Sequence, residues 1–196
     1  MTVSKHAYVP LFRRRRMGVT DYKARKKIIT SSIPLLAVRV SSKNALAQFI
    51  EPKAEGDHVL SSAHSRNLKK LGWKGSPKSV PACYLLGLLA GKKAKAEGVE
   101  RAYLYNGLTK FVKGSRVAAV VKGVKDAGID VPMSDEVAPS EERLTGKATA
   151  QYAKSLLAED KAKYSKVFSG MLKTGFKPED YAESTSKVKQ AILKGK

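Results

Sequence analysis

The segment from Ser79 to Gly98 constrains the fold most, because its pattern predicts one buried helix. Its first half, residues 80–90, is apolar nearly all round, which is typical of a helix packed on a sheet. Ser79 is placed to cap the helix, Pro81 falls in the first turn, and Gly98 can end it. The apolar run is far shorter than the ~20 residues that span a bilayer, so we predict a core helix and no membrane contact.

Three short β-type segments, residues 35–40, 45–50 and 58–65, precede this helix and are joined by short polar connections. Such connections predict an antiparallel meander. A fourth segment, 99–105, follows the helix and can therefore lie parallel to one of the first three. A second amphipathic helix is predicted over 117–127. The sequence thus predicts an α/β protein with a mixed sheet and packed helices.

The composition changes after residue 131, where acids and bases intersperse and helical stretches are predicted near 147–158 and 180–194. Apolar residues are too few there for a second core, so we predict a helical extension. The predicted organisation is a basic arm (1–32), an α/β globular domain (33–131) and a helical C-terminal extension (132–196).

Positive charge dominates the chain, which has 38 Lys and Arg against 17 Asp and Glu, a net charge of +21. Residues 1–27 alone hold nine bases, including Arg13 to Arg16, against the single acid Asp21. Self-repulsion of this size costs stability unless a polyanion offsets it, and a guanidinium pairs bidentately with phosphate. We therefore predict a nucleic-acid partner. A solvated basic tail or a targeting segment is the alternative reading of the arm.

Catalytic chemistry is not indicated. Cys83 is the only cysteine, which excludes an internal disulfide and fits a reducing, cytoplasmic compartment. His6, His58 and His64 lack metal-ligand spacing, and no phosphate-binding loop is found. We assign no catalytic residue, metal, cofactor or small-molecule substrate. A metal-dependent nuclease would need carboxylates on the central strands, and residues 35–40 have none. A free-standing RNA chaperone stays open.

Three local patterns are candidate RNA contacts. The first is His64 with Ser65 and Arg66 at a strand end, although a structural role for His64 is equally open. The second is Lys113, Ser115 and Arg116, where a helix start could bind phosphate. The third is Trp73 beside Lys74, which could stack on a base with ~1–3 kcal/mol. Anchoring of the loop on the core is the favoured alternative for Trp73.

Several motifs, in this order along residues 8–146, closely resemble one family: Arg13-Arg14-Arg15-Arg16 with Thr20-Asp21-Tyr22, Ala63-His64-Ser65, Gly72-Trp73-Lys74-Gly75, Pro81-Ala82-Cys83-Tyr84-Leu85, Lys113-Gly114-Ser115-Arg116 and Asp126-Ala127-Gly128. That family is the universal large-subunit ribosomal protein numbered eighteen, which binds 5S rRNA, in its archaeal and eukaryotic form. The resemblance implies a three-layer fold similar to ribonuclease H. It also implies a structural, non-enzymatic protein of the cytoplasmic large ribosomal subunit, which attaches 5S rRNA to the central protuberance.

The partners implied are 5S rRNA, large-subunit rRNA and neighbouring large-subunit proteins. By position, the resemblance adds the hairpin residues around Lys43 to the contacts suggested by charge. The complete predicted interface is Arg13, Arg14, Arg15, Arg16, Tyr22, Lys23, Arg25, Lys26, Lys27, Arg39, Ser41, Ser42, Lys43, Asn44, Gln48, His64, Ser65, Arg66, Trp73, Lys74, Lys113, Ser115 and Arg116.

Overall fold

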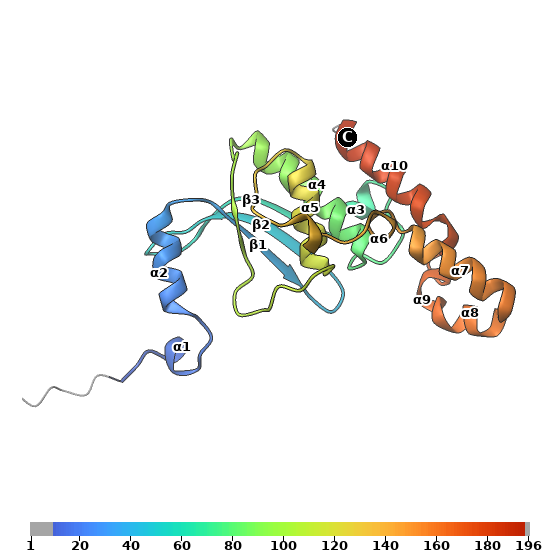
Figure 1. Cartoon of the computed structure of the whole chain (residues 1–196), viewed down its shortest axis with the longest axis horizontal. Helices are drawn as coiled ribbons and strands as arrows, with labels where there is room; N and C mark the ends of the chain where they lie inside the picture. The colour runs from blue at the N-terminus through green and yellow to red at the C-terminus, as the bar shows by residue number, and fades with distance from the viewer. Residues whose placement is uncertain (1–9, 195–196) are drawn as a thin grey trace, which may run out of the picture.

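A four-stranded mixed sheet is the centre of the protein (Figure 1), as described by a computed structural model of residues 10–194. Its strands are β1 (Leu35–Val40), β2 (Ala45–Glu51), β3 (His58–His64) and β4 (Tyr103–Tyr105), in the order β3-β2-β1-β4. β1–β2 and β2–β3 pair antiparallel, whereas β1 and β4 pair parallel. The predicted α/β class, meander and parallel return strand are confirmed. Lys5 and His6 lie outside the described residues.

The helices are α1 (Arg13–Arg16), α2 (Tyr22–Ser31), α3 (Asn67–Lys70), α4 (Val80–Ala96), α5 (Arg116–Asp126), α6 (Glu141–Thr145), α7 (Lys147–Glu159), α8 (Lys161–Val167), α9 (Ser169–Leu172) and α10 (Tyr181–Lys194), with 3-10 turns η1 (Asp135–Val137) and η2 (Pro178–Asp180). The predicted helices correspond to α4, α5, α7 and α10. Ser79 caps α4 as expected, since its hydroxyl accepts a hydrogen bond from the N–H of Ala82. No helix within the described range is long and apolar enough to cross a membrane.

The predicted strand over 99–105 is too long, because only Tyr103 to Tyr105 pair with β1. The residues before them pair with the segment after α5 instead. The N–H of Ala102 donates to the carbonyl of Asp130 (3.0 Å), and the N–H of Asp130 donates to the carbonyl of Glu100 (2.9 Å). The segment 99–105 therefore pairs first with Asp130 and then with β1, and the sequence alone does not show where the change of partner occurs.

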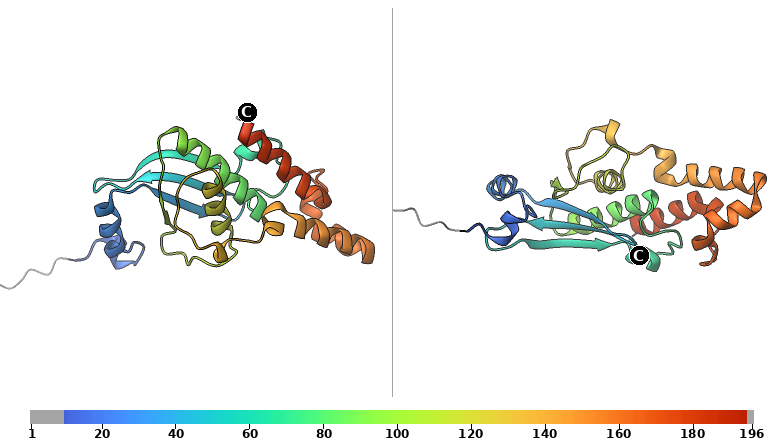
Figure 2. Two further views of the ribbon diagram at one scale, coloured as in Figure 1. Left: turned by 45° about the horizontal axis from the view of Figure 1, so that its top comes forward. Right: turned by 90° about the horizontal axis from the view of Figure 1, so that it is seen from below.

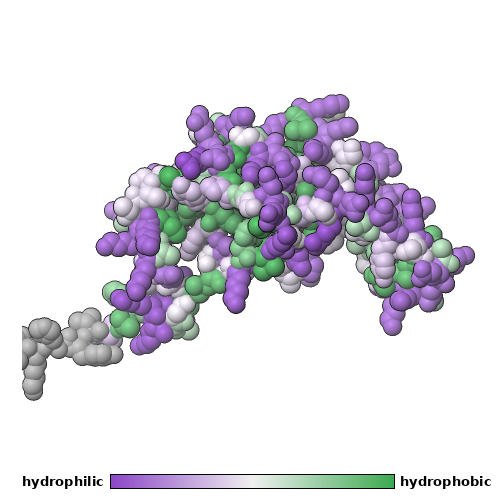
Figure 3. All heavy atoms as spheres, viewed as in Figure 1, coloured by the Kyte–Doolittle hydropathy of each residue, from purple (hydrophilic) through white to green (hydrophobic). Residues whose placement is uncertain are grey.

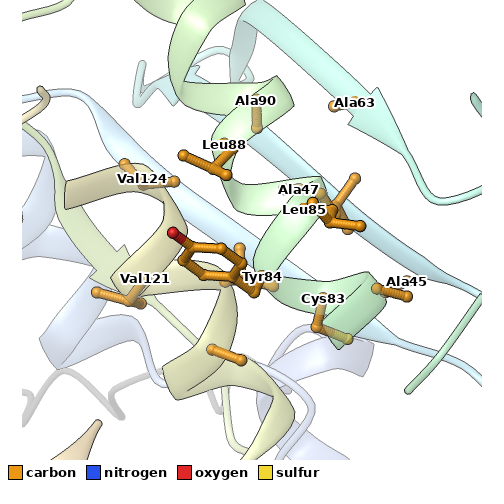
Figure 4. Close-up of a cluster of buried hydrophobic side chains, with 14 of the residues drawn as sticks. Ala45, Ala47, Ala63, Cys83, Tyr84, Leu85, Leu88, Ala90, Val121 and Val124 are labelled. Atoms are coloured by element: carbon orange, nitrogen blue, oxygen red, sulfur yellow. The ribbon is translucent and has the colours of Figure 1, made fainter. Parts of the chain in front are cut away.

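The main core lies between one face of the sheet and helices α4 and α5. Figure 4 shows Leu85 of α4 over Ala47 of β2, with Leu88 directed toward Val124 of α5. Small residues on the strands, such as Ala45, Ala47 and Ala63, let α4 approach the sheet closely, and all three are buried. This explains why the first half of α4 is apolar on every side.

Two glycines permit α4 and α5 to cross at backbone contact distance. A Cβ on Gly87 would lie 2.2 Å from the carbonyl oxygen of Val120. A Cβ on Gly123 would lie 2.3 Å from the carbonyl oxygen of Tyr84. Real Cβ atoms do not approach backbone so closely, so only glycine fits at either position.

The C-terminal extension packs on this same core rather than forming a large one of its own. Leu144, Phe176, Tyr181, Val188 and Ile192 join the main cluster, and α10 lies against α4 (Figure 2). A small second cluster within the extension consists of Ala153, Leu156, Tyr164 and Phe168. The extension is helical, as predicted. Its apolar residues are few because the main core supplies most of their partners.

A polar network fastens α10 to the domain. The hydroxyl of Tyr84 on α4 donates to the carboxylate of Asp126 (2.8 Å) and accepts from the Nζ of Lys189 on α10 (3.0 Å). The Nζ of Lys92 donates to the carbonyls of Ile192 (2.8 Å) and Leu193 (3.0 Å) at the end of α10. Burial and the bond to Asp126 raise the pKa of the Tyr84 phenol, so it stays a donor well above neutral pH.

The second half of the predicted arm is a helix attached to the sheet, which was not predicted from the sequence. The carboxylate of Asp21 accepts bonds from the N–H groups of Lys23 and Ala24 and so caps α2. The guanidinium of Arg25 pairs with the carboxylate of Asp57 (2.9 Å) in the β2–β3 turn. Ile28 contacts an apolar cluster on the sheet face opposite α4. The missed signal was Asp21 directly before a run of helix-forming residues.

Cys83 is fully buried at the start of α4, with its thiol 3.8 Å from the carbonyl oxygen of Lys78. Burial raises the pKa of the Cys83 thiol to about 12 from the ordinary value of 9.0. Between these values the unfolded chain loses the proton and the folded chain keeps it. The buried, protonated thiol therefore makes its full contribution to the free energy of unfolding below pH ~9, and this contribution is lost as pH rises toward 12.

Relative to Cys83→Ala, the unfolding free energy of the wild type should fall between pH 9 and 11, by up to ~1.4 kcal/mol per pH unit. Urea unfolding of both proteins across that range measures this. Tyr84 is present in both, so its titration cancels in the difference. Parallel pH profiles would show that the thiol ionises freely in the folded protein.

Candidate nucleic-acid interface

Two grooves open where β1 ends and where α4 and α5 begin. The hairpin groove, of about 500 Å³, is lined by Ser42, Lys43, Asn44, Arg66, Lys69, Ser76, Pro77 and Lys78. The helix-start groove, of about 400 Å³, is lined by Val40, Val80, Thr109, Lys110, Gly114, Ser115, Arg116, Val117 and Arg143. Segments that are distant in sequence thus meet at one end of the sheet.

Short polar contacts shape the hairpin groove. The hydroxyl of Ser41 donates to the carbonyl of Asn44 (2.9 Å) and accepts from its N–H (3.0 Å), which closes the β1–β2 turn. The ring Nδ1 of His64 accepts from the N–H of Arg66 (3.0 Å) at the start of α3. His64 therefore positions the backbone that carries Arg66, which gives it the structural role that its sequence context left open.

The N-terminus of α5 contributes to the helix-start groove. The hydroxyl of Ser115 accepts from the N–H of Ala118 (3.3 Å) and caps the helix. The other free N–H groups of the first turn, together with Arg116, are available to an anion. Arg143 of α6 reaches the same groove. Lys113, which was predicted with Ser115 and Arg116, is exposed but does not line the groove.

Both grooves are strongly cationic. Four cations line the hairpin groove and three line the helix-start groove, and no carboxylate lines either one. None of the seven forms an ion pair within residues 10–194. Hydrophilic side chains also cover most of the face seen in Figure 3. Cations without partners repel one another, so an anionic ligand with several charges fits these grooves.

Burial removes two predicted residues from this surface. Ser65 has no exposed area, and its hydroxyl accepts from the N–H of Ala45 (3.0 Å), tying β3 to β2. Trp73 is 2% exposed, contacts the ring of Tyr181 edge-on at 5.7 Å, and donates to the carbonyl of Ser76 (3.3 Å). The prediction of direct RNA contact is corrected for both. The alternative reading of Trp73, as an anchor of its loop on the core, is confirmed.

Three predicted residues share the sheet face opposite α4. Strand register places Arg39 of β1 beside Leu46 of β2, and Leu46 beside His64 of β3. Gln48 lies on the same face, because side chains two apart on a strand point the same way. Arg39 is exposed, whereas Gln48 and His64 are half-buried. This face can present amide, imidazole and guanidinium groups together.

The basic arm is at the other end of the sheet from the grooves (Figure 1). Arg13, Arg14, Arg15 and Arg16 form α1 and are all exposed. Arg14 donates to the hydroxyl of Thr20 (3.0 Å). On α2, the predicted residues Tyr22, Lys23, Lys26 and Lys27 are exposed. Arg25 differs, because its guanidinium is engaged with Asp57 and holds α2 in place.

Four cations of the two grooves were not predicted from the sequence: Lys69, Lys78, Lys110 and Arg143. Lys69 and Lys78 lie beside predicted contacts, so their charge was the available signal. Arg143 comes from the extension, and no local pattern relates it to α5. As for metals, the described part of the chain has no group of three or more His, Cys, Asp or Glu side chains that could hold an ion.

Known proteins resemble this chain over nearly its whole length. Residues 6–99 match the family described as ribosomal large subunit proteins 60S L5 and 50S L18. The large ribosomal subunit protein uL18 of Thermofilum pendens is 47% identical over 184 residues, covering 94% of this chain and 93% of the relative. That of Aeropyrum pernix is 45% identical over 185 residues, covering 94% and 86%.

These relatives confirm the resemblance to the archaeal and eukaryotic type. They also confirm a ribosomal rather than enzymatic class and a location in the cytoplasmic large ribosomal subunit. Identity of this level over this length, in a chain that presents an exposed arginine helix and two cationic grooves, shows that the protein belongs to the uL18 family of large ribosomal subunit proteins.

Proposed function

We propose that this protein binds 5S rRNA and helps attach it to the central protuberance of the large subunit. The observation that carries the proposal is the set of seven cations around two grooves that contain no carboxylate. Nucleic-acid phosphates fit such grooves best, because Lys and Arg side chains that neutralise them release the counterions condensed on the nucleic acid. Membership of the family supplies the ribosomal setting.

The arm and the grooves lie at opposite ends of the sheet, so one RNA would contact both while passing over the face that carries Arg39, Gln48 and His64. In this proposal, the arm residues around Arg15 and the groove residues around Arg66 bind phosphate. The hairpin hydroxyls and amides are short and exposed enough to contact sugar and base edges. Large-subunit rRNA and neighbouring proteins are proposed partners of the remaining surface, including the extension.

We also propose that the fold is three-layered and similar to that of ribonuclease H. The order β3-β2-β1-β4, with an antiparallel meander and a parallel fourth strand reached through α4, supports a ribonuclease H-like sheet. Helices α4 and α5 form one layer over it, and on the opposite face Ile28 of α2 contacts the sheet. The division into arm (1–32), domain (33–131) and extension (132–196) is proposed on the same footing.

Arg15→Ala with Arg16→Ala should weaken 5S rRNA binding by ~2–4 kcal/mol, taking about 1–2 kcal/mol for each charge-assisted hydrogen bond to phosphate that the substitutions remove. Log affinity of the wild type should fall against log salt with a slope of roughly −5 to −9, and the double variant should show a shallower slope. Filter binding of transcribed 5S rRNA over a range of monovalent salt measures both quantities.

Lys147→Ala with Lys154→Ala is the matched control, since it removes two exposed charges on α7, away from arm and grooves. A slope near zero for the wild type would contradict binding through phosphates. Equal losses in the two double variants would move the interface off the arm. Equal affinity for 5S rRNA and an unrelated folded RNA of similar length would favour the RNA chaperone.

A further inference from the structure

A third groove, of about 610 Å³, opens between the loop at residues 73–77 and helices α8 and α9 of the extension. We call it the extension groove. It is lined by Lys69, Trp73, Lys74, Gly75, Ser76, Pro77, Val167, Phe168, Gly170, Met171 and Thr174. Lys69, Ser76 and Pro77 also line the hairpin groove, so the two grooves are continuous.

The extension groove differs from its neighbour in chemistry. Val167, which is 51% exposed, gives it an apolar wall together with the half-buried Pro77 and Met171, and the buried Phe168 lies behind them. Lys69 and Lys74 are exposed cations of its lining, and no carboxylate lines it. Neither lysine forms an ion pair among the described residues. An apolar wall therefore adjoins unpaired cations, and the continuous hairpin groove adds Lys43, Arg66 and Lys78 to them.

A nucleotide strand has the same two-part chemistry: flat, largely apolar bases on a chain of regularly spaced phosphates. A duplex hides its base faces, so only an unpaired base can use the apolar wall. The volume of the groove is ordinary for a site that holds a compact organic group. Cations along both adjoining grooves favour a polyanionic strand over an acidic protein segment, because a strand repeats its charge along its whole length.

We propose that the extension groove holds an unpaired RNA base, while the adjoining phosphates of that strand lie along the hairpin groove. The proposal rests on the proposed RNA-binding function. It gives the C-terminal extension a direct part in recognition, because Val167, Phe168 and Met171 all belong to it. The small cluster around Tyr164 and Phe168 then has the role of holding α8 and α9 in position.

Gly170 provides a way to fill the groove without touching its charges. A Cβ at Gly170 would meet no atom within 4 Å, and its backbone is not in the left-handed region. Gly170→Leu therefore adds an apolar side chain at the lining of the groove, with no clash at its Cβ. Ser169→Leu is the matched control, because Ser169 is exposed in the same helix but does not line the groove.

The full chain would be titrated with two probes, a fluorescent short oligouridylate and an abasic oligomer of the same length. The wild type and Ser169→Leu should bind the oligouridylate about tenfold more tightly, which is the gain expected from stacking of one base. Gly170→Leu should lose this preference and keep its affinity for the abasic oligomer. Lys69→Gln with Lys74→Gln should weaken binding of both probes.

Equal binding of the two probes by the wild type, or an undiminished preference in Gly170→Leu, would overturn the inference. A polyglutamate peptide that binds in a Gly170-dependent way, when the oligouridylate does not, would overturn it in favour of a protein partner. Measuring the 5S rRNA affinity of the same proteins distinguishes failure of the proposed function from failure of the inferred base site. Failure of the wild type to bind 5S rRNA would contradict the proposed function. Intact 5S rRNA binding without a preference for the oligouridylate would contradict only the inference that the extension groove holds a base.

Discussion

Gly87→Ala is expected to destabilise the protein by about 3 kcal/mol, the upper end of the range for overpacked cores. The new methyl group would lie 2.2 Å from the carbonyl oxygen of Val120, which is backbone and cannot rotate away. Helices α4 and α5 would have to separate, and the buried side chains on both sides of the crossing would pack less closely. Gly123→Ala should act similarly, because its methyl group would meet the carbonyl of Tyr84.

Urea unfolding followed by Trp73 fluorescence measures this destabilisation. Gly170→Ala is the control, since the same substitution in a helix with open space around it should be neutral or stabilising by ~0.5–1 kcal/mol. The double variant Gly87→Ala with Gly123→Ala should cost less than the sum of the single ones, because the first separation already makes room for the second methyl group. Additive costs would indicate two independent sites.

Trp73→Ala is expected to lower the unfolding free energy by about 3–5 kcal/mol, as is usual for removal of a large buried aromatic side chain. The indole joins the main core with Tyr181 and Phe176, and Tyr181 contacts both rings edge-on at 5.7 and 5.2 Å. Removing the indole would leave a cavity between the α/β domain and the extension. Circular dichroism during urea unfolding measures the change without relying on the tryptophan.

Tyr181→Phe is the matched comparison for Trp73→Ala. It keeps the ring contacts and removes only the hydroxyl that accepts from the N–H of Ser76 (3.3 Å). Its cost should be about 0.5–1.5 kcal/mol, the net value of one hydrogen bond. If Trp73→Ala cost no more than Tyr181→Phe, the indole would add little to the attachment of the loop to the core.

The α4 helix shows what was readable from the sequence. Its cap at Ser79, its apolar first half and its stop at Gly98 are all local signals, and the structure places the helix at Val80–Ala96. The three meander strands were readable for the same reason. Helix α2 has an equally local signal, the N-cap residue Asp21, but the dense positive charge of this segment predicts only RNA contact.

The arrangement of the site was not readable in this way. Arg25 had the same charge as its neighbours, and only the fold brings it to Asp57, which is 32 residues away. Trp73 and Lys74 are adjacent in sequence, yet one is buried against Tyr181 and the other is exposed.

The sequence by itself therefore determined that the ligand is negatively charged, because the net charge of the chain is +21. It also determined the local helices and strands, through caps and periodicity. Only the tertiary structure decided which cations share a groove and which aromatic rings are hidden. Lys43, Arg66 and Lys78 come from three connections that meet because β1 and β3 end, and α4 begins, at the same end of the sheet. Caps and periodicity act over a few residues, whereas burial and ion pairing depend on neighbours that the folded chain alone brings together.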